Sequence, residues 1–564
     1  MQKETEKVIQ LKRKGQTILE RKRELFFERL FSLSPERIVN FILEQKNAKQ
    51  IVQEFTTLDL YWLLKKIGEE DFIPILELAS KEQWQYILDM EIWNRDRFDV
   101  NRAAIWLRRF MEADAEKLAN WLITDDMEMF TYYFFYRTLE VVVVTDDNVY
   151  ELSEDYFTLD NTFYMRIKDD SLRDVVEDLL KIIAGKNFLK YQALLMTSRA
   201  ILPASTEEEL YRLRSVRIAE YGFLPFEEAI SIYSPINPEK LIRSVNNKYS
   251  DIIVVDNEIR EIIPVFPIHQ LQTKGIFHLM IHSIKDNILM DRIRLEFVGL
   301  CNQLISADAL FISDFEDIIK VCKKAAGYLN IAIEDVCNNN VHKAIELVKH
   351  NSFVSIFRVG FGLTLKLRWE VEKWLKKSWF KKQGLSPDFW GEEWGNIIKG
   401  LLKKRPMYYV GIEQGEEYRF FESLSELRYC ENIFFNLQLL DKLFENITDL
   451  HPIEKTLITD PTITFHPFLF TFWARKLLGL KPGFHALTMD QVKEFFRILR
   501  SKDTAFPYKM EGFKGIFLKE IGAYMLEYDI EKILSSLWDE FCDEYKNIEI
   551  QDIDERYVRF LIIK

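Results

Sequence analysis

Two histidines have the spacing at which side chains can bind one metal ion together. His278 and His282 lie in the segment GIFHLMIHSIKDNILM, so on a helix their imidazoles share one face and could chelate Zn²⁺. Asp286 follows at the same spacing, but a helix rises about 12 Å between His278 and Asp286, too far for one ion. A metal site therefore needs a ligand from elsewhere. The apolar surroundings favour the alternative of two partly buried, hydrogen-bonded histidines, and we expect no bound metal or other cofactor.

The segment 366–405 is the most basic part of the chain and is rich in tryptophan. It carries eleven Lys and Arg against five acids, and it holds Trp369, Trp374, Trp379, Trp390 and Trp394. On a helix, one stripe of this segment is an ordinary core face, formed by Leu367, Val371, Trp374 and Ser378. A second stripe, roughly opposite, is formed by Trp369, Lys373, Lys376 and Phe380 at the spacing i, i+4, i+7, i+11.

This second stripe alternates aromatic and cationic side chains, which suits stacking or cation–π contacts with a partner. We therefore predict that its four residues bind a partner. The alternative interpretation is that another helix covers Trp369 and Phe380 while the lysine side chains extend outward to the solvent.

Common catalytic signatures are missing from the sequence. It has no HExxH, no GxxxxGK[ST] and no GxSxG motif, and no EF-hand loop. Adjacent acids point in different directions on a helix or strand, so pairs such as Glu227–Glu228, Glu392–Glu393 and Glu416–Glu417 predict solvated surface. The scattered cysteines form no CxxC pair and fit reduced thiols: Cys301, Cys322, Cys337, Cys430 and Cys542.

Composition indicates a globular, helical protein of several folding units. Of the 564 residues, 48% are hydrophobic and 29% charged, while Gly (20) and Pro (15) are scarce, which favours helices. No apolar stretch reaches the roughly 20 residues of a membrane-spanning helix, and the first residues have no apolar signal-peptide core. We therefore expect a cytoplasmic protein without a transmembrane segment. The net charge of −13 argues against a general nucleic-acid binder.

The N-terminal part predicts stacked short helices. Residues 1–30 are predicted to form a charged helix with Leu11, Ile18 and Leu25 on one face. Within 31–137, four segments begin with a small or capping residue and continue with an acid or amide and an apolar stripe: SPERIVNFIL, GEEDFIPILEL, SKEQWQYILDM and DAEKLANWLIT. Helices this short are unstable alone, so they must stack into a superhelix or solenoid. We predict a shared core of Leu63, Ile75, Trp84, Ile87, Trp106 and Trp121.

Further along, short β segments interrupt the helices. Residues 138–170 predict a β insertion, with a hairpin turning at 145–148 and a third strand at 162–168. A helical segment at 171–235 precedes a Pro-rich linker at 236–270, with a candidate hairpin at IIVVDNEIREII. We expect an α-helical domain at 271–405, which begins with a helix at 275–306. For 406–564 we expect a hairpin at 407–421, helices, and a C-terminal strand at 556–564 that joins one of the hairpins.

Particular segments resemble known families. EEDFIPILELASKEQWQYILDMEIWNRDRFDVNRAAIWL, LRSVRIAEYGFLPFEEAISIY and ERYVRFLIIK resemble a bacterial family known only as a domain of unknown function, over most of the chain. That resemblance implies no activity. Residues 31–137 also resemble the superhelical cytosolic domain of MgtE-type magnesium channels and the helical units of the flagellar switch protein FliG. The pore and nucleotide-binding modules of those channels are absent here, so transport is not implied.

The fold class expected is predominantly α, with stacked helices and small β-hairpin insertions. Stacked helices build extended binding surfaces, which favours a protein–protein interaction scaffold or regulatory adaptor. The first alternative is an enzyme with an unrecognised, metal-assisted site at His278 and His282. The second is a module that binds nucleic acid or membrane lipid through 366–405. Whether the protein is an enzyme is left open at this point.

Overall fold

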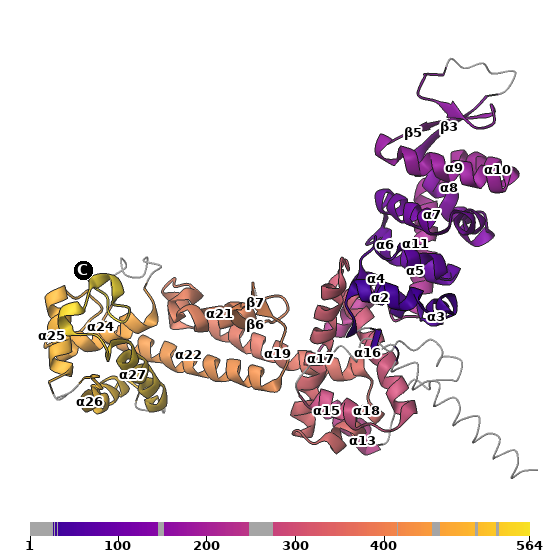
Figure 1. Cartoon of the computed structure of the whole chain (residues 1–564). Helices are drawn as coiled ribbons and strands as arrows, with labels where there is room; N and C mark the ends of the chain where they lie inside the picture. The colour runs from indigo at the N-terminus through magenta and orange to yellow at the C-terminus, as the bar shows by residue number, and fades with distance from the viewer. Residues whose placement is uncertain are drawn as a thin grey trace, which may run out of the picture. The chain divides into compact units, whose positions relative to one another are not determined.

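The computed structural model divides the chain into two compact units. It describes residues 26, 29–30, 32–144, 152–247, 275–413, 415–453, 463–501, 506–525 and 530–564 (Figure 1). Unit 1 consists of residues 1–329 and 335–358, and unit 2 consists of residues 330–334 and 359–564. Most of the predicted N-terminal helix at 1–30, the turn at 145–148 and the hairpin at IIVVDNEIREII lie outside the described residues. The other domain boundaries inferred from the sequence stay predictions.

The first part of unit 1 is a run of consecutive short helices, as the capping motifs predict. They are α2 (Pro35–Leu43), α3 (Ala48–Glu54), α4 (Thr57–Ile67), α5 (Ile73–Leu78), α6 (Lys81–Glu91), α7 (Val100–Leu122) and α8 (Asp125–Thr138). Helices two places apart pack on one another, α2 on α4, α3 on α5, α4 on α6 and α5 on α7. Each amphipathic face is thereby buried by a neighbour, which short helices need for stability.

Three of the four capping motifs begin helical turns as expected, and one does the opposite. Ser34 is the N-cap residue of α2. Ser80 caps α6 in a reciprocal capping box with Gln83. Asp114 breaks α7 with a non-helical backbone and accepts a hydrogen bond from the amide of Lys117 at 2.8 Å, which starts a new turn. Gly68, in contrast, ends α4 with a φ of 102°, a value that glycine tolerates, and α5 begins only after Phe72.

The six residues predicted to share the core of this region are all buried: Leu63, Ile75, Trp84, Ile87, Trp106 and Trp121. Their tryptophans meet around Phe110, whose ring lies 4.6 Å from that of Trp84, 5.8 Å from that of Trp106 and 6.0 Å from that of Trp121. The ring contacts connect α6 with both parts of α7. The prediction of buried positions from helical periodicity is confirmed here.

The β insertion has a different pairing from the one predicted. Strand β3 (Leu139–Val143) pairs antiparallel with β5 (Phe163–Ile167), and the short β4 (Phe157–Thr158) pairs with the other edge of β5. The predicted third strand corresponds to β5 and is central to the sheet. Strand β3 pairs with β5 across a connection that is longer than the turn of a tight hairpin. A two-residue pair that was not predicted, β1 (Trp93–Asn94) with β2 (Arg97–Phe98), turns between α6 and α7.

Further helices complete unit 1. They are η1 (Asp170–Leu172), α9 (Arg173–Lys186), α10 (Phe188–Ala200), α11 (Pro203–Ala219), α12 (Phe226–Ala229), η2 (Ile230–Tyr233), α13 (Pro238–Asn247), α15 (Ile276–Ser283), α16 (Asn287–Asp308), α17 (Phe315–Cys337) apart from residues 330–334, α18 (Val341–His350) and the start of α19 (Phe353–Leu375). The helix expected at 275–306 is two helices. Ile284 adopts an extended backbone, and Asp286 caps α16 by accepting from the amide of Ile288 at 3.0 Å.

Unit 2 is helical around an aromatic core and contains a β-hairpin. Its helices after α19 are α20 (Trp379–Lys382), η4 (Pro387–Trp390), α21 (Glu392–Leu401), α22 (Leu424–Leu450), α24 (Phe465–Leu477), α25 (Met489–Leu499), α26 (Glu511–Gly522), α27 (Glu531–Tyr545), η5 (Ile550–Asp552) and η6 (Glu555–Tyr557). The predicted hairpin is confirmed, because β6 (Tyr408–Glu413) pairs antiparallel with β7 (Glu416–Arg419). In the core, the ring of Phe470 stacks on that of Phe541 at 4.5 Å.

The predicted C-terminal strand is wrong. Within the residues that the structure describes, the backbone of 556–564 makes an isolated parallel bridge, Leu487 with Ile563, and joins none of the strand pairs. The amide of Lys564 donates to the carbonyl of Leu487 at 3.0 Å, and the amide of Leu487 donates to the carbonyl of Ile562 at 2.9 Å. β-branched composition predicts an extended backbone, but a strand also needs a long partner edge, which the segment before α25 does not offer.

Among the described residues, none of the helices has the length and apolar character needed to cross a membrane.

Candidate functional site

The two candidate metal ligands lie side by side on α15. The ring centroids of His278 and His282 are 4.3 Å apart, with His278 partly buried and His282 exposed. Asp286 lies outside this helix, because it caps α16. Throughout the described ranges, no group of three or more His, Cys, Asp or Glu side chains is placed to hold a metal ion. The structure therefore brings together the pair that the sequence suggested and adds no third ligand to it.

The closest thiol pair was not visible in the sequence. Cys301 on α16 and Cys322 on α17 are both buried, with their sulfur atoms 3.9 Å apart, and none of the five cysteines forms a disulfide. Burial, followed by the neighbouring Cys322, raises the pKa of Cys301 well above its ordinary value. A thiol kept protonated in this way is a poor nucleophile. The pair fits a packing role.

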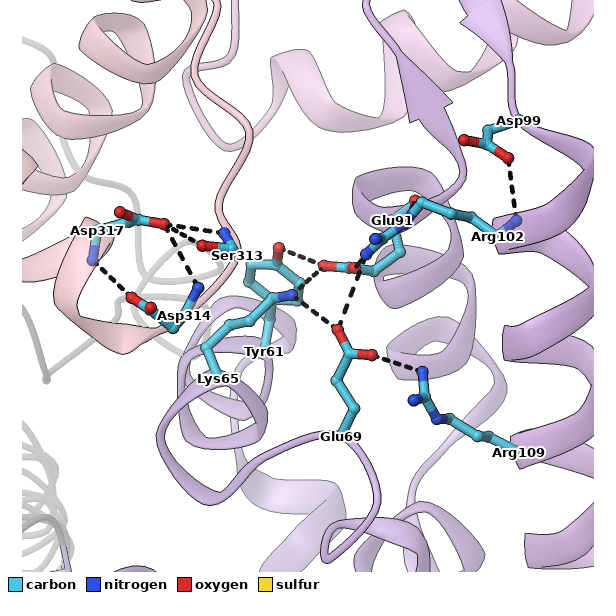
Figure 2. A network of polar contacts seen from close by, with 10 residues as sticks. All are labelled: Tyr61, Lys65, Glu69, Glu91, Asp99, Arg102, Arg109, Ser313, Asp314 and Asp317. Atoms are coloured by element: carbon cyan, nitrogen blue, oxygen red, sulfur yellow. Dashed lines mark hydrogen bonds and ion pairs between the residues drawn. The ribbon is translucent and has the colours of Figure 1, made fainter.

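A buried polar network joins three helices of unit 1 (Figure 2). Glu91 on α6 is fully buried, and its carboxylate accepts from the hydroxyl of Tyr61 at 2.7 Å. The same carboxylate pairs with Lys65 of α4 at 2.7 Å and with Arg102 of α7 at 2.5 Å. Glu69, after α4, pairs with Lys65 at 3.2 Å and with a second α7 residue, Arg109, at 2.6 Å.

The donors around these carboxylates make the network a structural element. Burial alone would raise the pKa of Glu69, but Lys65 and Arg109 outweigh burial and the pKa lies below its ordinary value. Burial and then Glu91 raise the pKa of Tyr61 well above its ordinary value, so this hydroxyl remains a donor. Both oxygens of Glu91 have charged partners, which leaves no free general base. The network holds α4, α6 and α7 together.

The predicted partner-binding stripe is only partly present. Trp369 is 51% exposed, and Lys373 and Lys376 are exposed, as the prediction requires. The prediction is wrong for Phe380, because this side chain is 0% exposed and cannot contact a partner. The ring of Phe380 packs against Trp374 at 5.3 Å and against Trp390 at 5.6 Å.

The reason is a turn that helical spacing did not reveal. Helix α19 ends at Leu375, so Lys376 and Phe380 do not continue its face. Asp441 of α22, buried and 61 residues away from Phe380, accepts from the amides of Trp379 and Phe380 at 2.9 and 3.0 Å and holds the start of α20. Burial raises the pKa of Asp441, and these two amide donors offset only part of that rise. In the sequence, the only indication of this contact is that Asp441 is a single acid within the apolar run LQLLDKLF.

The exposed residues of this region form a basic surface even though Phe380 is buried. We define it as Lys366, Trp369, Lys373, Lys376 and Lys377, all of which are exposed. In the described part of the chain, no carboxylate forms an ion pair with these four lysines, and one exposed acid, Glu370, lies among them in sequence. Neighbouring cations are compensated, since Arg368 pairs with Glu372 at 2.8 Å, Lys382 with Glu445 at 3.1 Å and Lys399 with Asp388.

The fold defines a predominantly α-helical protein with small antiparallel β pairs. The chain belongs to a family of unknown function (DUF6178), which it matches over residues 16–564. No curated protein and no solved structure shows significant similarity to the chain. The resemblance to an uncharacterised family is thus confirmed, whereas the resemblance of 31–137 to magnesium channels and FliG is not shown.

Proposed function

We propose that this protein is a cytoplasmic scaffold or adaptor that binds an acidic protein partner through the basic surface. The observation that carries the proposal is the set of four exposed, uncompensated lysines around a half-exposed tryptophan. Tryptophan is enriched among the residues that contribute most to binding energy. Unpaired lysines beside it would attract a negatively charged partner and accelerate association.

Helix α19 makes this surface rigid on its inner side. Leu367 and Val371 are buried, so the helix cannot rotate to hide Trp369 without exposing them. A large side chain held in place before binding loses little conformational entropy when a partner covers it. Trp369 is therefore suited to be the central contact, with lysines at its edge.

The charge distribution favours a compact acidic protein over a long polyanion. The segment 366–405 carries a net charge of +6, and the rest of the chain carries −19. A polyanion that extends beyond the basic surface would meet this negative remainder and be repelled. A folded partner with a small acidic patch avoids that repulsion.

Charge reversal at Lys373 and Lys376 tests the proposal. Tagged parent protein, the variant Lys373→Glu/Lys376→Glu and the control Lys46→Glu/Lys49→Glu are used to capture proteins from native lysate at two salt concentrations. The control has the same change in net charge at two exposed lysines of unit 1. We expect the parent and the control to capture the same acidic proteins, with less capture at high salt, and the variant to lose them.

Equal capture by the parent and the Lys373→Glu/Lys376→Glu variant would contradict the proposal. A parallel titration with a labelled single-stranded oligonucleotide and a labelled Glu-rich peptide distinguishes the partner classes. Tighter binding of the oligonucleotide, lost in the same variant, would support the nucleic-acid alternative instead.

A further inference from the structure

Helix α10 exposes an apolar stripe that is separate from the basic surface. Leu189 is 77% exposed and Met196 is 52% exposed, and Ala193 and Ala200 are also exposed. The spacing i, i+4, i+7, i+11 places these four residues on one face of the helix. The opposite face is buried against α8 and α9 (Figure 1) and consists of Tyr191, Leu194, Leu195 and Ser198.

We propose that this stripe binds a second copy of the chain, with the two α10 helices antiparallel. The stripe alternates large and small side chains in the order Leu189, Ala193, Met196, Ala200. A two-fold axis midway between residues 194 and 195 brings Leu189 level with Ala200 of the second copy. The same axis brings Ala193 level with Met196 of the second copy. Each large side chain therefore meets a small one, as an isologous interface requires.

The charges beside the stripe are compatible with this pairing. No charged residue lies within it, and the lysines next to it are compensated inside their own chain: Lys186 by Glu116 at 2.8 Å, and Lys190 by Glu128 at 3.5 Å. These two lysines therefore contribute little repulsion across the two-fold axis.

Contacts at the edges of the stripe add to the interface. In the proposed register, Arg199 of one copy and the exposed Phe188 ring of the second copy lie on the same side of the helix–helix interface. The two side chains are then within reach of a cation–π contact. Exposed Leu202 extends the apolar surface at one end. A single helix pair buries less area than a standard interface, so we expect a weak, concentration-dependent dimer.

Substitution at the centre of the stripe tests the dimer. In the proposed register the two Met196 side chains lie near the two-fold axis, so Met196→Glu brings two carboxylates close together. We expect this variant to weaken dimerisation, measured by sedimentation equilibrium, by at least about tenfold. The control Val216→Glu changes an equally exposed apolar residue of α11 and should leave the dimer unchanged. Circular dichroism verifies that both variants fold.

Cross-linking tests the register. Leu189 and Ala200 are about 16.5 Å apart along the helix axis, so the variants Leu189→Cys and Ala200→Cys should each fail to form a disulfide-linked dimer alone. Their mixture should form one under mild oxidation, above the background of the parent. Efficient cross-linking of either variant alone would overturn the antiparallel register. A parent that stays monomeric at every concentration would overturn the proposal, and the stripe would then have a different occupant.

Discussion

The indole of Trp84 stacks on the ring of Phe110, with centroids 4.6 Å apart and planes inclined by 19°. The indole N–H donates to the carbonyl of Leu76 at 2.9 Å, and the ammonium of Lys117 lies 3.9 Å from the indole centroid. One side chain of α6 therefore contacts α5 and both parts of α7. The packing of the N-terminal helices depends on it.

Replacing Trp84 with alanine should strongly destabilise unit 1. Truncation of a fully buried tryptophan costs about 3–5 kcal/mol in the free energy of unfolding, because contacts are lost and a cavity remains. Chemical denaturation measures the loss. The control Trp369→Ala, at a half-exposed position, should change stability by less than about 0.5 kcal/mol. A Trp84→Ala protein as stable as the parent would contradict the core assignment.

Removal of the charge of Glu91 should also be costly. Glu91→Gln leaves Lys65 and Arg102 facing a neutral group, and breaking a buried ion pair typically costs about 3–5 kcal/mol. Thermal denaturation compares this variant with Glu140→Gln, which breaks an exposed pair with Arg166 and should cost about 1 kcal/mol or less. Equal effects of the two variants would show that the network of Figure 2 does not hold the helices together.

Lys117 should make stability depend on pH. Burial lowers the pKa of Lys117 from its ordinary 10.5 to about 8, and the nearby Asp114 opposes that shift only in part. Between pH 8 and 10.5 the unfolded state therefore binds more protons at this residue than the folded state does. By linkage, this residue's contribution to stability rises with pH across that window.

The variant Lys117→Met isolates this contribution from other groups that titrate in the same range. Melting temperatures of the parent and the variant are measured from neutral to alkaline pH. We expect the difference between the parent and the variant to move in favour of the parent as pH rises. A difference that is constant with pH would show that the folded pKa of Lys117 is not lowered.

Substitutions at Phe380 and at the two lysines of the predicted stripe should differ strongly in their effect on stability. Phe380→Ala should lower the free energy of unfolding by about 3–5 kcal/mol, because its ring is fully buried. Lys373→Glu/Lys376→Glu should lower the free energy of unfolding by less than about 1 kcal/mol, because both side chains are exposed. Most of this small loss should come from Lys373, which lies in the last turn of α19, where a cation is favoured. Denaturation of both variants checks this contrast, and a large loss in the lysine variant would mean that these side chains are packed.

Metal content tests the interpretation of the histidine pair. We expect elemental analysis of purified protein to find no stoichiometric transition metal, since zinc sites usually have three or four protein ligands and two are present here. One zinc per chain that disappears in His278→Ala/His282→Ala would instead revive the metal-assisted enzyme hypothesis.

Features that depend on residues close together in the chain could be predicted from the sequence alone. Ser80 and Gln83 cap α6 because both lie within one turn, and the buried tryptophans follow from helical periodicity. The hairpin of β6 and β7 follows from a short Gly-containing turn between two strand-forming segments. Such features need only local geometry and the burial of one face.

Features that depend on distant partners became known only from the folded structure. Phe380 is buried because Asp441 holds the start of α20, and β3 pairs with β5 because a distant segment offers the longer edge. The spacing of the apolar residues of α10 can be recognised in the sequence. The exposure of the stripe cannot be predicted from it, because α10 is apolar on both faces. Which face is covered depends on where α8 and α9 pack, because hydrophobic burial is non-directional and the position of the neighbours selects the buried side.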